Sequence, residues 1–276
     1  MDVTTIDYAR AGSGDPLVLI HGIGHQRSAW GETFELLAQD FDVIALDLPG
    51  FGKSPAPAPP YSYRMDSYVE QLEDFFDHLG LDRPHVAGNS LGGMFALELA
   101  ARGSVRTATA ISPAGFWGPL GLVNAVANLS LMKASSHAPR RVVRLFSDKA
   151  ALRKASLRAL YVHPENVPGA VAYDDALNLR TSPGFFPVAW HATRSRFRHQ
   201  PLVPVTIAWG TKDRLLLPSQ AATARAELPM VSHLTLPDCG HVPMIDNPEL
   251  VAGAIVQTVV QAADRAGQPL LHLTGV

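Results

Sequence analysis

One serine lies where a reactive hydroxyl is expected. Ser90 is the central residue of a Gly-x-Ser-x-Gly motif, between a short apolar run over residues 84–88 and an apolar stretch over residues 94–101. A strand-like run, a glycine turn and a helix-like stretch are typical of a nucleophile elbow, in which a strained turn exposes the serine hydroxyl. Gly88 and Gly92 have no Cβ, so strand and helix can approach closely there. A glycine-rich turn that merely contains a serine is the alternative, and the motif alone does not exclude it.

A carboxylate and a histidine that could activate this serine follow later in the chain. Asp213 comes just after an apolar run over residues 203–210, and His241 comes after the next one. A serine hydroxyl is a weak nucleophile without a neighbouring base. Histidine titrates near neutrality, so it can accept the serine proton and return it to a leaving group. A buried carboxylate would orient that histidine, and Asp238 competes with Asp213 for this role.

Alternating strands and helices position these three residues. Apolar runs predict strands over residues 3–10, 16–20, 41–46, 84–88, 107–112, 203–210 and 232–236, and helical spacing predicts helices near residues 34–37, 65–79, 94–101, 218–227 and 248–265. Such alternation predicts the α/β class, with a mostly parallel central sheet covered by helices. Ligands of such sheets gather at the carboxyl ends of the strands, where Ser90 falls.

Residues 113–199 break this alternation. The segment lacks strand patterns and predicts helices at about 119–134, 139–147, 149–160, 170–180 and 187–197. We interpret residues 114–199 as a helical cap inserted between two parts of one core, residues 1–113 and 200–276.

The predicted cap is rich in cations. One stretch of it has Asp148 as its only acid and eight basic residues: Lys133, Arg140, Arg141, Arg144, Lys149, Arg153, Lys154 and Arg158. A solvated outer face is the favoured explanation for charges on amphipathic helices. An arginine that binds a substrate carboxylate, or a face that meets an anionic membrane, is the alternative.

Composition restricts the class of protein. The chain has 276 residues, 47% hydrophobic and 17% charged, with a formal net charge of -2, so nothing points to a nucleic-acid partner. A single cysteine, Cys239, excludes an internal disulfide, and we expect a small packed residue there rather than a nucleophile. The first residues do not resemble a signal peptide, and no apolar stretch is long enough to cross a bilayer. We expect a cytoplasmic protein.

Two short motifs are better explained as structure than as ligand sites. His21 and His25 are four residues apart but have no third ligand nearby, so we expect His21 to brace its loop rather than bind a metal. Gly52-Lys53-Ser54 resembles the end of a phosphate-binding loop, but that motif needs a glycine where Leu48 stands. We therefore interpret residues 47–54 as a turn, and we expect no metal and no cofactor.

The chain resembles the α/β-hydrolase family. His21-Gly22-Ile23-Gly24, the turn 47–54, the elbow 88–92 and Gly240-His241 have the order of that family over nearly the full length, with the cap as the unmatched part. The acid at 213 also fits the family's order of serine, acid and histidine. The resemblance implies that Ser90 is the nucleophile, that His241 is the general base and then acid, and that Asp213 orients it. It also implies an oxyanion hole made by the amides of Ile23 and Leu91.

The nucleophile narrows the expected chemistry. Related dehalogenases and epoxide hydrolases use aspartate at the elbow, so the serine favours a carboxylic-ester hydrolase with an acyl-enzyme intermediate and a hydrophobic small-molecule substrate. A carbon–carbon bond hydrolase of the meta-cleavage type is the alternative, since residues 88–93 and 239–241 resemble that subfamily. His25-Gln26, however, stand where that subfamily has Pro-Gly. A cofactor-free haloperoxidase-like enzyme and a noncatalytic small-molecule receptor remain open.

Overall fold

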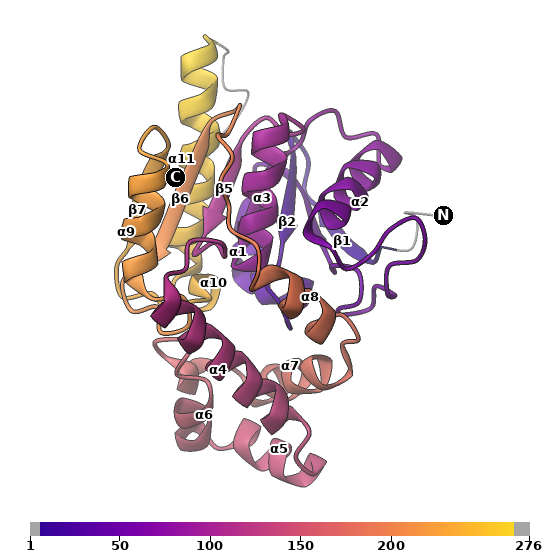
Figure 1. Ribbon diagram of the computed structural model, residues 1–276, viewed down its shortest axis with the longest axis vertical. Coiled ribbons are helices and arrows are strands. Elements are labelled where there is room, and N and C mark those ends of the chain that lie inside the picture. Colours follow the sequence, from indigo (N-terminus) through magenta and orange to yellow (C-terminus); the bar gives the residue numbers. More distant parts are fainter. Residues whose placement is uncertain (1–5, 268–276) are drawn as a thin grey trace.

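The centre of the molecule is a seven-stranded sheet (Figure 1). The structure is a computed structural model that describes residues 6–267. The strands follow the spatial order β1-β3-β2-β4-β5-β6-β7, and every neighbouring pair is parallel except β1 with β3. Their bounds are β1 Tyr8–Ala11, β2 Pro16–Ile20, β3 Asp42–Leu46, β4 His85–Asn89, β5 Ala108–Ile111, β6 Val205–Gly210 and β7 Ser232–Leu236. The predicted α/β class with a mostly parallel sheet is confirmed.

Helices cover both faces of the sheet because alternate strand residues point to opposite sides. Val18 and Ile20 of β2 pack into one core with helices α2 and α3, whereas Leu17 and Leu19 pack into a second core with helices α1 and α11. Both faces are apolar, as expected of a parallel sheet that is buried on both sides. The helices around the sheet are α1 (Gly31–Leu37, after the 3-10 turn η2, Arg27–Trp30), α2 (Met65–His78), α3 (Leu91–Arg102), α9 (Pro218–Glu227), α10 (Pro243–Asp246) and α11 (Pro248–Ala266).

A helical segment connects β5 to β6 and lies beyond the end of the sheet (Figure 1). It contains α4 (Pro119–Ser136), α5 (Arg140–Asp148), α6 (Ala150–Ser156), the 3-10 turn η3 (Pro164–Asn166), α7 (Gly169–Thr181) and α8 (Phe185–Ala192). The carboxyl end of β2 points towards this segment (Figure 1), and β4 is parallel to β2, so the helices of the segment lie over the edge where ligands of α/β sheets bind.

Two helices of this segment differ from the predicted ones. The helix predicted over 149–160 ends at Ser156, and the helix predicted over 187–197 begins at Phe185 and ends at Ala192. Beyond Ala192 the hydroxyls of Thr193 and Ser195 donate to the carbonyls of Ala189 and His191. Such side-chain bonds compete with the backbone ladder and favour a helix end, which the apolar spacing alone did not indicate.

Some expectations concern the chain ends. The strand predicted over 3–10 begins partly outside the described residues, within which β1 starts at Tyr8. Between residues 6 and 267, no helix has the length and apolarity needed to cross a membrane.

Candidate active site

A strained turn joins β4 to α3 at Ser90. The backbone of Ser90 has a φ of 57° and a ψ of -112°, a conformation that side chains other than glycine rarely adopt. A Cβ at Gly88 would lie 2.0 Å from the carbonyl oxygen of Gly92, and a Cβ at Gly92 would lie 2.1 Å from that of Ile20. Both positions therefore require glycine, and the close crossing of strand and helix holds the serine on a sharp turn at the edge of a cavity.

A buried carboxylate and imidazole meet beyond β6 and β7. His241 Nδ1 lies 2.8 Å from Asp213 Oδ2, and each residue is only 2% exposed. The other carboxylate oxygen, Asp213 Oδ1, accepts hydrogen bonds from the amides of Leu215 and Leu216 at 2.9 and 2.8 Å. These contacts fix both oxygens of the carboxylate, which in turn fixes the orientation of the imidazole.

Asp238 lies outside this arrangement. Its side chain is 79% exposed and forms an ion pair with Lys212 at 2.8 Å, and this cation lowers the pKa of the Asp238 carboxyl. The structure thus brings His241 together with Asp213 and leaves Asp238 in solvent.

Close backbone contacts hold the histidine loop against the sheet. A Cβ at Gly210 would lie 2.3 Å from the carbonyl oxygen of Gly240, so this crossing also requires glycine. The amide of Lys212 donates to the carbonyl of Cys239, and Asn89 Nδ2 donates to the carbonyl of His241 at 2.9 Å. Asn89 precedes Ser90, so this hydrogen bond connects the serine turn directly to the histidine loop.

The loop after β2 approaches the serine from the other side. A Cβ at Gly22 would lie 3.1 Å from the Cβ of Ser90, and the next residue, Ile23, lines the same cavity. Within the described part of the chain, no group accepts a hydrogen bond from the amide of Ile23 or Leu91. Leu91 is the first residue of α3, where backbone amides have no partner within the helix and favour an anion.

His21 braces this loop, as predicted. Its Nε2 accepts a hydrogen bond from the amide of Leu48 at 2.9 Å, and its Nδ1 lies 2.7 Å from the carbonyl oxygen of Gly22. Burial lowers the pKa of His21, so the ring is neutral and links the loops after β2 and β3. Burial also lowers the pKa of the neighbouring His25, to about 3. Residues 6–267 contain no group of three or more side chains suited to holding a metal ion.

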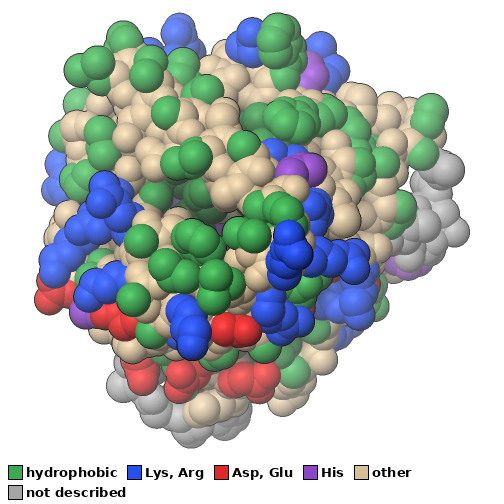
Figure 2. Space-filling model, turned by 90° about the horizontal axis from the view of Figure 1, so that it is seen from below, with side chains coloured by type: hydrophobic (Ala, Val, Ile, Leu, Met, Phe, Trp, Pro, Cys, Tyr) green, Lys and Arg blue, Asp and Glu red, His purple; other side chains and the backbone are tan. Residues whose placement is uncertain are grey.

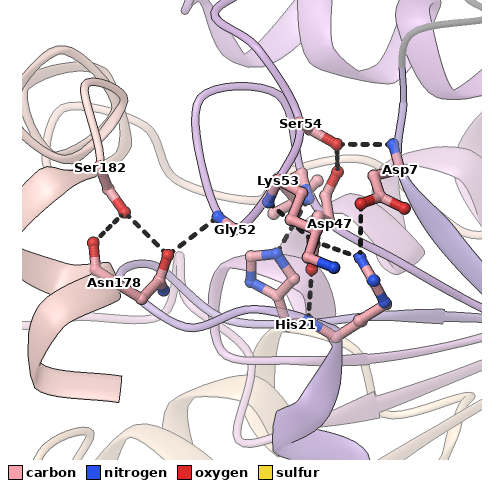
Figure 3. A network of polar contacts seen from close by, with 10 residues as sticks. Asp7, His21, Asp47, Gly52, Lys53, Ser54, Asn178 and Ser182 are labelled. Atoms are coloured by element: carbon pink, nitrogen blue, oxygen red, sulfur yellow. Dashed lines mark hydrogen bonds and ion pairs between the residues drawn. The ribbon is translucent and has the colours of Figure 1, made fainter. Parts of the chain in front are cut away.

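The turn 47–54 is a structural network (Figure 3). Asp47 accepts hydrogen bonds from the amides of Arg27 and Lys53 at 2.7 and 2.9 Å, and it forms an ion pair with the Arg27 guanidinium at 2.6 Å. The Ser54 hydroxyl donates to the backbone carbonyl of Asp47 at 2.6 Å. These internal contacts use the backbone amide of Lys53 and the hydroxyl of Ser54 within the turn itself.

Asn178 of α7 ties the helical segment to the loops after β2 and β3, and Figure 3 shows its contact with Gly52. Its Oδ1 accepts a hydrogen bond from the amide of Gly52 at 3.0 Å, and its Nδ2 donates to the carbonyl of Gly24 at 3.1 Å. Gly24 directly follows Ile23, so α7 contacts the loop that borders the serine.

A cavity of about 270 Å³ contains Ser90 and His241 at one end. Most of its other walls are apolar side chains from helices of the connecting segment, including Leu129, Met132, Val142, Val143, Phe146 and Leu179. Four further ionisable side chains line it: His25, Arg153, Tyr161 and Asp175. Burial raises the pKa of Asp175 to about 6, although a hydrogen bond from Gln26 opposes the shift, and burial keeps the pKa of Tyr161 well above its usual value.

Most cations of the connecting segment point away from this cavity. Only two of the eight are buried. Lys133 Nζ donates to the carbonyls of Leu179 and Arg180, and the two terminal nitrogens of Arg153 donate to those of Ser147 and Glu165. The other six are exposed. The predicted solvated face therefore accounts for the six exposed cations. Of the Arg153 nitrogens only Nε has no partner, so the two terminal nitrogens are not free to bind a carboxylate together.

Cys239 packs in the core beside the histidine loop. The side chain is fully buried among the apolar residues between the sheet, α1 and α11. Burial raises the pKa of its thiol to about 11, so the reactive thiolate is absent at neutral pH.

Comparison with known proteins decides the family. The model of the alpha/beta hydrolase fold family matches residues 15–248. The chain belongs to this family. The predicted resemblance is confirmed, and in this hydrolase Ser90, Asp213 and His241 follow β4, β6 and β7.

The relatives and structural neighbours of the hydrolase include an uncharacterised protein, a dienoic acid hydrolase and a phospholipase. An uncharacterised protein of Mycobacterium tuberculosis is 30% identical over 253 residues, 86% of this chain and 73% of the relative. The 2-hydroxy-6-oxo-6-(2'-aminophenyl)hexa-2,4-dienoic acid hydrolase of Metapseudomonas resinovorans is 27% identical over 272 residues, 93% of this chain and 88% of the relative. The crystal structure of a bacterial membrane phospholipase A superposes with a TM-score of 0.73 at 27% identity, covering 94% of this chain and 83% of that one.

Sequence reasoning assigned no role to three residues of the site. Asn89, Asp175 and Asn178 contact the histidine loop, the cavity and the loop after β2. Asn89 had a usable signal, because it adjoins Ser90 within the elbow motif. Asp175 and Asn178 are polar residues of α7, and nothing in the sequence of this helix sets them apart. Only the packing of α7 against the sheet loops places them at the site.

Proposed function

We propose that this hydrolase cleaves carboxylic esters through an acyl-enzyme intermediate. The observation that carries the proposal is the 2.8 Å contact between His241 Nδ1 and Asp213 Oδ2, at the edge of a cavity that also holds the strained serine. Since Nδ1 faces the carboxylate, Nε2 is the ring nitrogen left to accept a proton from Ser90.

The reaction uses this chain's own groups in two steps. His241 takes the proton of the Ser90 hydroxyl while the serine oxygen attacks the ester carbonyl, and the amides of Ile23 and Leu91 stabilise the oxyanion. His241 then protonates the leaving alcohol. In the second step His241 takes a proton from water, which attacks the acyl carbon. His241 then returns this proton to the Ser90 oxygen as the bond between serine and the acyl group breaks and the carboxylic acid leaves. Asp213 stabilises the imidazolium in both steps.

The helical segment acts as a cap in this proposal. It comprises residues 114–199, between core parts 1–113 and 200–276, and most of the apolar side chains of the cavity belong to it. We infer that these side chains bind a hydrophobic acyl or alcohol group of the substrate, because apolar walls with few polar groups are typical of small-molecule sites.

Labelling with a fluorophosphonate tests the nucleophile. The probe should modify the peptide that contains Ser90, and Ser90→Ala should abolish both the adduct and the hydrolysis of p-nitrophenyl esters. Ser135→Ala is the matched control, because Ser135 lines the same cavity but lies away from the elbow. An adduct that persists in Ser90→Ala would overturn the assignment of the nucleophile.

Carbon–carbon bond hydrolysis is the second candidate. The relative from Metapseudomonas resinovorans favours it, since that enzyme is named for hydrolysis of a dienoic acid. The cavity favours the ester, because its polar lining does not suit the carboxylate of a dienoate. Asp175 in the lining would repel that carboxylate, and the terminal nitrogens of Arg153 already bind backbone carbonyls. A panel of p-nitrophenyl esters and a dienoate ring-cleavage product separates the two, and tight binding without turnover would instead indicate a receptor.

A further inference from the structure

Helix α4 presents an uncharged apolar face to solvent. Lys133 is the only charged residue of its 18, and this side chain is buried. Leu120 is 84% exposed, Val123 66% and Leu131 69%. A surface helix of a globular protein normally has charged or polar residues on its outer face, so α4 departs from the usual pattern.

Helix α8 extends this apolar face. Phe186 is 67% exposed and Trp190 is 60% exposed, although large aromatic side chains are usually covered. Lys133 Nζ lies 5.6 Å from the centre of the Phe186 ring, so the C-terminal part of α4 reaches the start of α8 through this side chain. The exposed apolar side chains therefore come from two adjoining helices rather than from scattered positions.

Cations adjoin the apolar face. Arg140 and Arg141 begin α5, which follows α4 after a three-residue connection, and both are exposed. Among residues 6–267 neither forms an ion pair, and the Arg144 guanidinium stacks on the Tyr173 ring at 3.8 Å instead of pairing with an acid. Figure 2 views this end of the molecule and shows hydrophobic side chains around a hollow, with Lys and Arg side chains beside them.

The cavity of the site reaches the surface at the same end. Phe146 of α5 lines the cavity and is also 41% exposed, and Ser135 of α4 is both exposed and part of the lining. Leu131 on the outer face of α4 adjoins Met132 on the cavity side. A ligand that reached the exposed apolar face would therefore be near an entrance to the cavity.

We propose that α4, α5 and α8 form a docking surface for an anionic lipid bilayer. The docking surface consists of Leu120, Val123, Leu131, Phe186 and Trp190 with Arg140, Arg141 and Arg144. Apolar and aromatic side chains enter the boundary between head groups and acyl chains, while neighbouring arginines bind anionic head groups. This charge complementarity identifies the bilayer as anionic, in a chain whose overall charge is -2.

Sedimentation with vesicles tests the docking surface independently of catalysis. Ser90→Ala hydrolase is mixed with vesicles of phosphatidylcholine alone or with about 30% phosphatidylglycerol, so that no lipid is hydrolysed. We expect the protein to sediment with the anionic vesicles at low salt, to be released at high salt, and to remain largely free with phosphatidylcholine.

Paired variants locate the contact. Leu120→Asp with Leu131→Asp, and Arg140→Glu with Arg141→Glu, should each weaken binding to the anionic vesicles by about tenfold or more. Met230→Asp and Arg225→Glu are matched controls, because Met230 is 89% exposed and Arg225 is exposed on α9, outside the docking surface. Unchanged melting temperatures show that the variants are folded.

Three results would overturn the proposal. They are equal binding to both kinds of vesicle, no binding to either, and equal binding by the paired variants and their controls. If the Ser90→Ala parent does not bind vesicles but is a dimer, and the leucine variants are monomers, the surface is an interface between two copies of the chain. Failure of ester hydrolysis would refute the proposed function and leave the vesicle result unaffected.

Discussion

At the residue scale, the carboxylate that faces His241 is the most informative contact of the site. Asp213→Asn keeps the size of the side chain but removes the charge that stabilises the imidazolium. We expect kcat to fall by about 10⁴-fold, as in the serine-protease template, with an unchanged melting temperature. Hydrolysis of a p-nitrophenyl ester at saturating substrate measures the effect.

Asp238→Asn is the control for that substitution. The Asp238 side chain forms only an exposed ion pair with Lys212, and such pairs contribute little, so kcat should stay within about twofold of the parent. The reverse pattern, with a large loss for Asp238→Asn alone, would place the acid on the loop after β7 and contradict the geometry.

The sequence was sufficient to predict the residues of the site that follow strands, but not those whose position depends on the packing of helices. Ser90, Asp213 and His241 were predicted because each follows an apolar run, and the structure places them at strand ends. Asp175 and Asn178 belong to α7, whose position relative to the sheet depends on contacts between residues far apart in the chain. A pattern that describes one helix carries no information about those contacts.

At the element scale, the order of strands and helices followed from periodicity, whereas their ends depended on side-chain hydrogen bonds. The predicted sheet strands agree closely with β2, β3 and β5, because buried strands of a parallel sheet are continuous apolar runs. The end of α8 was placed too late, since Thr193 and Ser195 bond back to the helix. The close approach of strand and helix at Gly88 and Gly92 followed from the elbow motif, whereas the contact of Gly92 with Ile20 of β2 depends on a strand far away in the sequence.

The contact of α7 with the loop after β2 can be tested by substitution of Asn178. Asn178→Asp retains the acceptor for the Gly52 amide but replaces the donor to Gly24 with an oxygen, so it disturbs the loop that carries Ile23. Loss of such a hydrogen bond costs about 1–2 kcal/mol, and we expect kcat to fall about tenfold while KM changes little. Steady-state kinetics with one p-nitrophenyl ester gives both constants.

Two comparisons separate a positioning role from general destabilisation. Asn178→Leu removes both hydrogen bonds and should lower kcat and the melting temperature together. Thr181→Val, on the same helix, removes only a hydroxyl that donates within α7, and it should leave kcat unchanged. An Asn178→Asp variant with full kcat would show that α7 does not position the loop.

At the scale of the whole molecule, the free energy of unfolding depends on pH through buried groups whose pKa is shifted by burial. Burial lowers the pKa of His85 to about 4 and raises that of Asp175 to about 6. The two groups act in opposite directions. A buried histidine with a lowered pKa makes the fold less stable as the pH falls, because the unfolded chain then binds a proton that the folded chain does not bind. A carboxyl with a raised pKa loses stability as the pH rises.

Asp175→Asn should therefore stabilise the chain more at neutral pH than in acid. The unfolded carboxyl titrates near 3.8 and the folded one near 6, so its stabilising contribution is full below 3.8 and is lost as the pH rises through 6. Relative to the parent, the free energy of unfolding of Asp175→Asn should increase by about 1.5 kcal/mol between about pH 5 and 7.5. Urea unfolding at both pH values measures the difference.

His85→Gln should also gain stability relative to the parent, but in acid instead of at neutral pH. His85 begins β4, lies 2.9 Å from the Thr107 hydroxyl and is 5% exposed, so its replacement changes packing by an amount that does not depend on pH. The unfolded histidine titrates near 6.5 and the folded one near 4, so the parent loses stability as the pH falls through this range. Between about pH 7.5 and 5, the free energy of unfolding of His85→Gln should rise by about 2 kcal/mol relative to the parent. Because Asp175→Asn changes in the opposite sense over the same interval, parallel shifts in the two variants would mean that burial of these groups does not control the pH dependence of the fold.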